Sequence, residues 1–220
     1  MPASFEETWH RRRARAGRAE KHLRRADPLL GVAIDRVVET LGAQRFASSG
    51  ASSHLDCIVR SVVYQQLSLK AASTIYGRML PCLGGRVTAS RLLAAPEPSL
   101  RAAGLSGAKV RYLRSLGTAV AEGSLRLNAV ARASDDEVVS ALTRLPGVGI
   151  WTAQMFLMFR LGRPDVLPVA DAGIRHGLRV AHGLSKLPTP TEVAAAGRSW
   201  APYRSIASLY LWALLELPKE

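Results

Sequence analysis

The sequence has few cysteines and no long apolar run. Its only two cysteines, Cys57 and Cys82, exclude a scaffold of several disulfides and a four-cysteine zinc or iron–sulfur site. No apolar stretch approaches the roughly 20 residues that cross a bilayer, and none follows the charged N-terminus as it would in a secretory signal. We therefore expect an intracellular protein without a membrane segment.

Acidic residues are also scarce relative to basic ones. Thirty Lys and Arg residues face 17 Asp and Glu residues, which gives a net charge of +13. Residues 1–25 hold eight basic and three acidic residues, so eight of the net charges lie in the rest of the chain. An excess of this size indicates a polyanionic partner. For the N-terminal segment two interpretations stay open, a solvated helix and an arm that contacts phosphates.

Apolar residues recur at spacings of three and four along most of the chain, which is typical of amphipathic helices. Glycine, proline and serine interrupt this pattern, and no two-residue alternation is present. Ser134 followed by Asp135, Asp136 and Glu137 is typical of a helix start. The sequence predicts an all-α protein of about ten helices. The predicted segments are Leu29–Leu41, Leu55–Leu67, Ala71–Leu83, Val110–Ala121, Asp136–Leu145, Trp151–Leu161, Ile174–Ala181 and Ile206–Leu215.

The most informative stretch separates two of these helices. It reads Leu-Pro-Gly-Val-Gly over residues 145–149, with Ile150, Trp151 and Thr152 next. Glycines permit left-handed backbone angles and place no Cβ in the way of a ligand. Amides at the start of the following helix can then bind a phosphate, and Pro146, Gly147, Val148 and Gly149 are candidate DNA contacts. Gly-x-Gly alone is also typical of an ordinary tight turn, but the full string in a basic chain favours the phosphate site.

These residues resemble the helix–hairpin–helix DNA glycosylase superfamily, because an aspartate, Asp171, follows the hairpin and opens another helix. Three further stretches are similar to the alkylpurine branch of that superfamily, 3-methyladenine DNA glycosylase II. They are Tyr64–Ala72, Gly104–Leu113 and Tyr203–Trp212. The resemblance covers about residues 22–217 and implies the compact form, since the chain is too short for the additional N-terminal β-rich domain.

The resemblance implies a helix–hairpin–helix glycosylase fold with two helical lobes around a DNA-binding cleft. Lobe one would comprise about residues 22–53 and 169–220. Lobe two would comprise about residues 54–168 and include the hairpin, and residues 1–21 would form a basic arm. The expected partner is double-stranded DNA containing alkylated bases, bound by a monomer with no membrane contact. The protein would then lie in the cytoplasm on a bacterial nucleoid, or in a eukaryotic nucleus.

By the same resemblance, Asp171 is the catalytic residue. From the residues alone, an aspartate before a helical run is a helix N-cap. The two roles are compatible, because an anion beneath the sugar stabilises the oxocarbenium-like transition state of N-glycosidic bond cleavage. Ala170 stands where the family often carries another aspartate.

The resemblance also implies a base pocket formed by Trp151, Met155 and Trp212. Electron-rich rings stabilise a cationic alkylated purine by stacking and cation–π attraction. Trp151 stands where the bifunctional glycosylase/lyases carry a Schiff-base lysine, and residues 145–175 contain no lysine. Core packing is the alternative interpretation of Trp151. Met155 replaces an aromatic residue of the family, which predicts a roomier wall.

Further DNA contacts follow from the resemblance. Gln66 would fill the gap left by the flipped nucleotide, with Leu67 as the alternative wedge. On the residues alone, Gln66 could be an ordinary surface glutamine. Ser68 and Lys70 would contact the DNA backbone, and the second DNA-side loop would add contacts from Gly104, Ser106 and Lys109.

No cofactor is expected. The five histidines, at positions 10, 22, 54, 176 and 182, show no metal-ligand spacing. Hairpins of this type often hold a monovalent cation. Here Na⁺ or K⁺ would bind the backbone carbonyls of Thr143, Leu145 and Val148.

We therefore predict a monofunctional DNA glycosylase that flips alkylated purines such as 3-methyladenine and 7-methylguanine and hydrolyses their N-glycosidic bond in base excision repair. One alternative is an oxidised-base glycosylase/lyase, which the tryptophan at position 151 disfavours. Another is a non-catalytic helix–hairpin–helix DNA-binding module, which would need the hairpin and the charge but not Asp171 or a tryptophan pocket.

Overall fold

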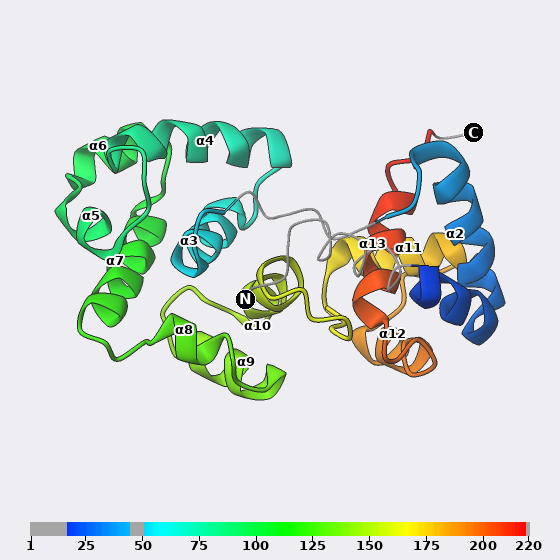
Figure 1. Ribbon diagram of the computed structural model, residues 1–220. Helices are drawn as coiled ribbons and strands as arrows, with labels where there is room; N and C mark the ends of the chain where they lie inside the picture. The colour runs from blue at the N-terminus through cyan, green and yellow to red at the C-terminus, as the bar shows by residue number, and fades with distance from the viewer. Residues whose placement is uncertain (1–16, 45–50, 219–220) are drawn as a thin grey trace. The chain divides into compact units, whose positions relative to one another are not determined.

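The computed structural model describes residues 17–44 and 51–218, and every regular element in these ranges is a helix (Figure 1). The predicted all-α class is confirmed. None of these helices has the length and apolarity needed to span a membrane. Most of the predicted basic arm, residues 1–16, lies outside the described residues.

The chain divides into two compact units, with the divisions after residues 46 and 162. The sequence places the lobe boundaries at about residues 53 and 168. The first unit contains helical residues 17–26 and the helices α2 (Pro28–Leu41), α11 (Ala172–Ala181), α12 (Pro190–Ala196) and α13 (Arg204–Leu214). The second contains α3 (His54–Tyr64), α4 (Leu69–Cys82), α5 (Ala89–Ala94), α6 (Glu97–Ala102), α7 (Gly107–Ala121), α8 (Leu127–Val130), α9 (Asp135–Thr143), α10 (Ile150–Met155) and the π-helix η1 (Phe156–Arg160).

In the first unit, α13 packs against both α11 and α2 (Figure 1). The core between them includes the fully buried side chains of Ile34, Trp200 and Tyr210. Asp27 caps α2 by accepting a hydrogen bond from the Leu30 amide at 3.0 Å. It also accepts hydrogen bonds from His182 and Trp200, each at 2.9 Å. One buried carboxylate therefore joins the start of α2 to the end of α11 and to the core.

Most helices of the second unit start at a serine or threonine cap. Ser134 caps the start of α9, as the sequence predicts, and the structure shows that it forms a capping box with Glu137. Ile58, Met79 and Phe156 are among its fully buried side chains.

Most predicted helix ends differ from the structure by one to three residues, and three differences affect the path of the chain. The helix predicted to reach Leu67 ends at Tyr64. The helix predicted over residues 151–161 becomes the π-helix η1 after Met155. The predicted gap Pro96–Pro98 contains the start of α6, because a proline in the first helical turn leaves no hydrogen bond unmade. The short helices α5, α8 and α12 span too few residues for their periodicity to be recognised.

Candidate functional site

The turn between α3 and α4 has an unusual backbone at Gln66. Its φ of 57° is the only positive φ among the non-glycine residues that the structure describes. A left-handed conformation costs a residue with a side chain about 1–2 kcal/mol. Gln66, Leu67 and Ser68 are exposed, and the Ser68 hydroxyl caps α4 by accepting a hydrogen bond from the Ala71 amide at 3.3 Å. The turn thus presents both candidate wedge residues on a strained and exposed backbone.

The hairpin between α9 and α10 uses its two glycines differently. Gly147 has a φ of 77°, and a Cβ added there would lie 2.1 Å from the Tyr112 ring of α7. Gly149 has an extended φ of −87°, and a Cβ added there would meet no atom within 4 Å. Gly147 is therefore required by the fold of the unit itself, whereas Gly149 leaves the backbone open to a ligand.

The second predicted DNA-side loop leads into α7, which Ser106 caps by accepting a hydrogen bond from the Lys109 amide at 3.2 Å. The Lys109 ammonium points into the protein. Its Nζ donates hydrogen bonds to the carbonyl oxygens of Val63 at 2.7 Å and Gln65 at 2.9 Å. Burial lowers the pKa of Lys109 below its ordinary value. This charge therefore already has two acceptors at the end of α3.

These two loops and the hairpin surround a cavity of about 550 Å³. Gln65 crosses it: its Nε2 donates to the carbonyl oxygen of Gly147 and to Oγ1 of Thr152, both at 2.9 Å. The structure thus brings predicted DNA contacts from three separate segments around one hollow. The lining residues are Gln65, Gln66, Ser106, Ala108, Lys109, Tyr112, Thr143, Leu145, Gly147, Val148 and Gly149. Gly104 precedes Ser106 in the second loop, and Lys70 is exposed in the first turn of α4.

The predicted pocket residues of the second unit lie on α10. Trp151 is half-buried and Met155 is buried. Their spacing of four residues places them on the same face of the helix. The base pocket predicted from the resemblance also includes Trp212, which belongs to the first unit. This pocket stays a prediction.

In the first unit, Asp171 is the N-cap of α11, as its sequence position predicts. Its Oδ1 accepts hydrogen bonds from the Ile174 amide at 2.8 Å and from Nε1 of Trp212 at 2.9 Å. A Cβ added to Gly173 would lie 2.6 Å from Cδ1 of Trp212, so a larger residue would push the indole away. Two predicted site residues that are 41 positions apart are thus hydrogen-bonded to each other, and both side chains are only partly buried.

Sequence reasoning missed four residues that shape these groups. Gly173 follows Asp171 closely, and a glycine at the start of a helix could have indicated close packing. Gln65, Tyr112 and Thr152 act across 35 or more residues, and no local pattern indicates their partners.

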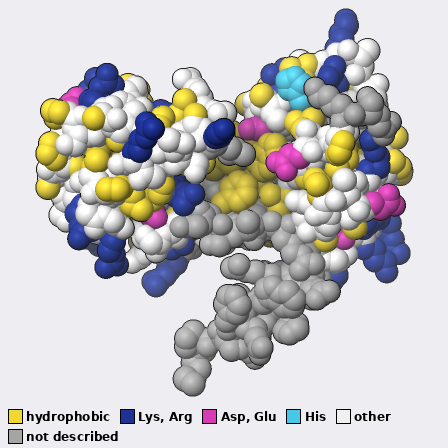
Figure 2. Space-filling view, turned by 90° about the horizontal axis from the view of Figure 1, so that it is seen from above, with side chains coloured by type: hydrophobic (Ala, Val, Ile, Leu, Met, Phe, Trp, Pro, Cys, Tyr) yellow, Lys and Arg dark blue, Asp and Glu magenta, His cyan; other side chains and the backbone are white. Residues whose placement is uncertain are grey.

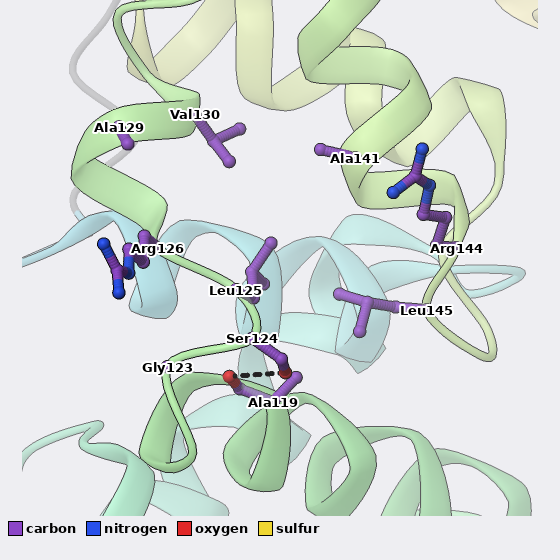
Figure 3. Close-up of a pocket in the computed structure, with 10 residues that line it drawn as sticks. All are labelled: Ala119, Gly123, Ser124, Leu125, Arg126, Ala129, Val130, Ala141, Arg144 and Leu145. Carbon is purple, nitrogen blue, oxygen red and sulfur yellow. Dashed lines mark hydrogen bonds between the residues drawn. The ribbon is translucent and has the colours of Figure 1, made fainter.

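A different cavity, of about 480 Å³, lies beside α8 in the second unit (Figure 3). Small and aliphatic side chains line most of this cavity, and Arg126 and Arg144 complete the lining. The Ser124 hydroxyl donates a hydrogen bond to the Ala119 carbonyl. This cavity shares only Leu145 with the cavity crossed by Gln65. It contains no carboxylate or other group suited to the predicted chemistry.

The basic character of the chain is visible on its surface. Figure 2 shows Lys and Arg side chains on the viewed face of both units. Neither unit alone accounts for the net charge.

Comparison with known proteins identifies the family. The model of the HhH-GPD superfamily of base excision DNA repair proteins matches residues 59–202. The chain belongs to this superfamily. The match includes the Gln66 turn, the hairpin and Asp171, which are the features that carry the resemblance in the sequence.

Several HhH-GPD relatives are similar over most of this chain. Bacillus subtilis YfjP is 32% identical over 168 residues, which are 73% of this chain and 58% of YfjP. Schizosaccharomyces pombe DNA-3-methyladenine glycosylase 1 is 36% identical over 158 residues, which are 70% of this chain and 69% of the relative. The chain therefore spans less than two thirds of the first relative and slightly more of the second.

The fold also agrees with a solved HhH-GPD structure. The S. pombe 3-methyladenine DNA glycosylase Mag1, in complex with abasic DNA, superimposes with a TM-score of 0.81 at 32% identity. The superposition covers 91% of this chain and 97% of that one. The predicted helix–hairpin–helix glycosylase fold is confirmed.

Proposed function

We propose that this protein is a monofunctional DNA glycosylase that removes alkylated purines from double-stranded DNA as the first step of base excision repair. The single observation that carries this proposal is the Asp171 carboxylate, fixed at the start of α11 by the Ile174 amide and the Trp212 indole. The names of the relatives, DNA-3-methyladenine glycosylase in S. pombe among them, support the substrate class.

The proposed reaction needs little beyond one positioned anion. The bond between C1′ of the sugar and the purine nitrogen breaks, and its electron pair leaves with the base. A base that alkylation has made cationic leaves as a neutral molecule. The positive charge that develops on the sugar is stabilised by Asp171, and the oxygen of a water molecule then bonds to C1′ and loses a proton. The indole of Trp212 keeps the carboxylate in one orientation, which lowers the cost of reorganisation.

The second unit supplies the proposed contacts to DNA. The hairpin and the turn at Gln66 line one cavity, and the open backbone at Gly149 leaves room for a phosphate. Trp151 and Met155 are proposed to contact the flipped base together with Trp212. The carbonyl oxygens of Thr143, Leu145 and Val148 are the proposed ligands of Na⁺ or K⁺, and a cation there would stiffen the hairpin. We expect the protein to bind DNA on the nucleoid of a bacterial cell or in the nucleus of a eukaryotic cell.

A lyase step is disfavoured by the side chain at position 151. A glycosylase/lyase needs an amine that attacks C1′ and forms a Schiff base. Trp151 has no amine, and residues 145–175 contain no lysine. The product is therefore an abasic site in an intact strand.

The test is single-turnover release of 7-methylguanine and 3-methyladenine from DNA treated with a methylating agent. We expect both bases to be released, strand breaks only after alkali, and no protein–DNA adduct on borohydride reduction. A glycosylase/lyase with its own substrate serves as the positive control for trapping. Trapping of this protein on methylated DNA would overturn the monofunctional assignment. DNA binding without release of any base would instead indicate a binding module.

A further inference from the structure

The Lys109 ammonium occupies a position where a helix end needs donors. The last carbonyl groups of α3 have no partner within the helix, and Lys109 donates to those of Val63 and Gln65. A positive charge at a helix C-terminus is also favoured by the helix dipole. The Lys109 side chain thereby fixes the backbone that immediately precedes Gln66.

The Gln65 side chain ties the same backbone to the hairpin. Its amide nitrogen donates to the Gly147 carbonyl and the Thr152 hydroxyl, 82 and 87 residues away. Gly147 itself is held against the Tyr112 ring, one helical turn after Lys109 on α7. The turn, the hairpin and α7 therefore form a closed set of contacts within the second unit.

These contacts surround Gln66, the one non-glycine residue with a left-handed backbone in the part of the chain that the structure describes. Gln66 follows Gln65 directly, so its conformation depends on the two carbonyl contacts of Lys109 and on the Gln65 amide. A wedge that is held in its bound conformation before DNA arrives loses less conformational freedom on binding. The observations thus connect four partly buried hydrogen bonds to the presentation of one exposed side chain.

We propose that Gln65 and Lys109 are positioning residues, which lock the turn carrying Gln66 onto the hairpin and so favour binding to DNA with a vacated base position. This inference rests on the proposed function, because it assumes that Gln66 enters the duplex. It assigns Lys109 a role inside the protein in place of the DNA contact expected from the resemblance.

The experiment compares two dissociation constants for each variant, one for undamaged duplex and one for a duplex with an abasic-site analogue. The Kd for undamaged duplex divided by the Kd for the abasic duplex measures the preference for a vacated base position. The slope of log Kd against log salt reports the number of phosphate contacts. We expect Gln65→Leu and Lys109→Met each to lower the ratio by about tenfold, the effect of losing roughly one net hydrogen bond. The salt slope on undamaged duplex should stay at the wild-type value.

Two comparisons make the result specific. Lys70→Met removes an exposed lysine of α4 and should weaken both duplexes alike, with a slope reduced by about one. Thr152→Val removes the acceptor for Gln65 and should lower the ratio, whereas Thr152→Ser keeps the hydroxyl and should retain it. Thermal melting on the same samples identifies unfolded variants. If the Gln65 or Lys109 variant does not fold, the Thr152 pair decides by the same ratio.

The outcomes separate this inference from the proposed function. A wild-type protein that does not prefer the abasic analogue would contradict the proposed function. If the wild type prefers the abasic duplex and the variants keep this preference, the positioning role is overturned and the proposed function stands. A Lys109→Met protein with a reduced salt slope and an unchanged ratio would show that Lys109 contacts phosphate, and would also overturn it.

Discussion

At the scale of single residues, Asp171 satisfies a folding requirement with the same carboxylate that, in the proposed reaction, would satisfy a chemical one. The helix start needs an acceptor for a free amide, and the proposed reaction needs an anion near the sugar. The hydrogen bond from Trp212 makes the two needs compatible, because it fixes the side chain without neutralising it. The small Gly173 lets the indole approach this closely.

Asp171→Asn should therefore separate the two roles. Asparagine caps helices about as well as aspartate, so the melting temperature should change little. The loss of the anion should reduce single-turnover release of 7-methylguanine by about 10²–10³-fold or more. Affinity for undamaged DNA should hold or increase slightly, because a negative charge has been removed. A fully active and stable variant would contradict the mechanism, and an inactive but strongly destabilised one would leave Asp171 only a helix cap.

Gln66→Ala tests the proposed wedge directly. The truncated side chain can no longer fill the space left by the flipped nucleotide, so binding to an abasic-analogue duplex should weaken by about 1–2 kcal/mol. Stability should not fall, since Gln66 is exposed. Fluorescence anisotropy on matched abasic and undamaged duplexes measures the effect. An unchanged affinity for the abasic analogue would remove Gln66 from the site.

At the scale of helices, the first unit depends on a carboxylate that joins elements far apart in the chain. Burial of Asp27 opposes its ionisation, but the hydrogen bonds from His182, the Leu30 amide and Trp200 outweigh this cost and lower its pKa to about 2. The ordinary value for an aspartate is 3.8. The ionised Asp27 thus stabilises the contact between the start of α2 and the end of α11.

This shift predicts an acid-sensitive contribution to stability. A lowered pKa in the folded state stabilises the protein at pH values above 3.8, and the contribution is lost as the pH falls towards 2. The size should be about 2 kcal/mol. Denaturant unfolding between pH 5 and pH 2 measures it as the difference between the wild type and Asp27→Asn. The two curves should converge at low pH. A constant difference across this range would show that the Asp27 charge is not coupled to folding.

At the scale of the whole molecule, charge governs the expected approach to DNA. Eight of the thirteen net positive charges lie outside residues 1–25, and the hairpin adds uncharged amide donors. Binding dominated by phosphate contacts releases counterions, and each neutralised phosphate contributes about 0.9 to the slope of log affinity against log salt.

We therefore predict a steep loss of affinity for undamaged duplex as salt increases. A nearly flat plot would contradict a phosphate-dominated interface. Deletion of residues 1–20 distinguishes the two interpretations of the basic N-terminal segment. The slope should decrease if the segment touches DNA, and it should keep its full value if the segment is only solvated.

The sequence alone determined the features that depend on neighbouring residues. The all-α class, the cap at Ser134, the cap at Asp171 and the turn at residues 145–149 each follow from hydrogen bonds or backbone angles within a few positions. Helix ends do not follow from periodicity alone, because the apolar pattern continues through Leu67 although α3 ends at Tyr64. The family resemblance added the candidate roles, since those depend on a motif pattern and not on local physics.

Only the tertiary structure decided which distant groups meet. Asp171 accepts a hydrogen bond from the indole of Trp212, and Gln65 donates one to the Gly147 carbonyl. The Lys109 ammonium donates to a carbonyl at the end of α3. An unpaired lysine or glutamine looks the same in a sequence whether it faces solvent or a buried carbonyl, and each has many chemically equivalent partners along the chain. Packing selects among them, because the carbonyl groups at a partly buried helix end need donors, and the fold brings Lys109 to those at the end of α3.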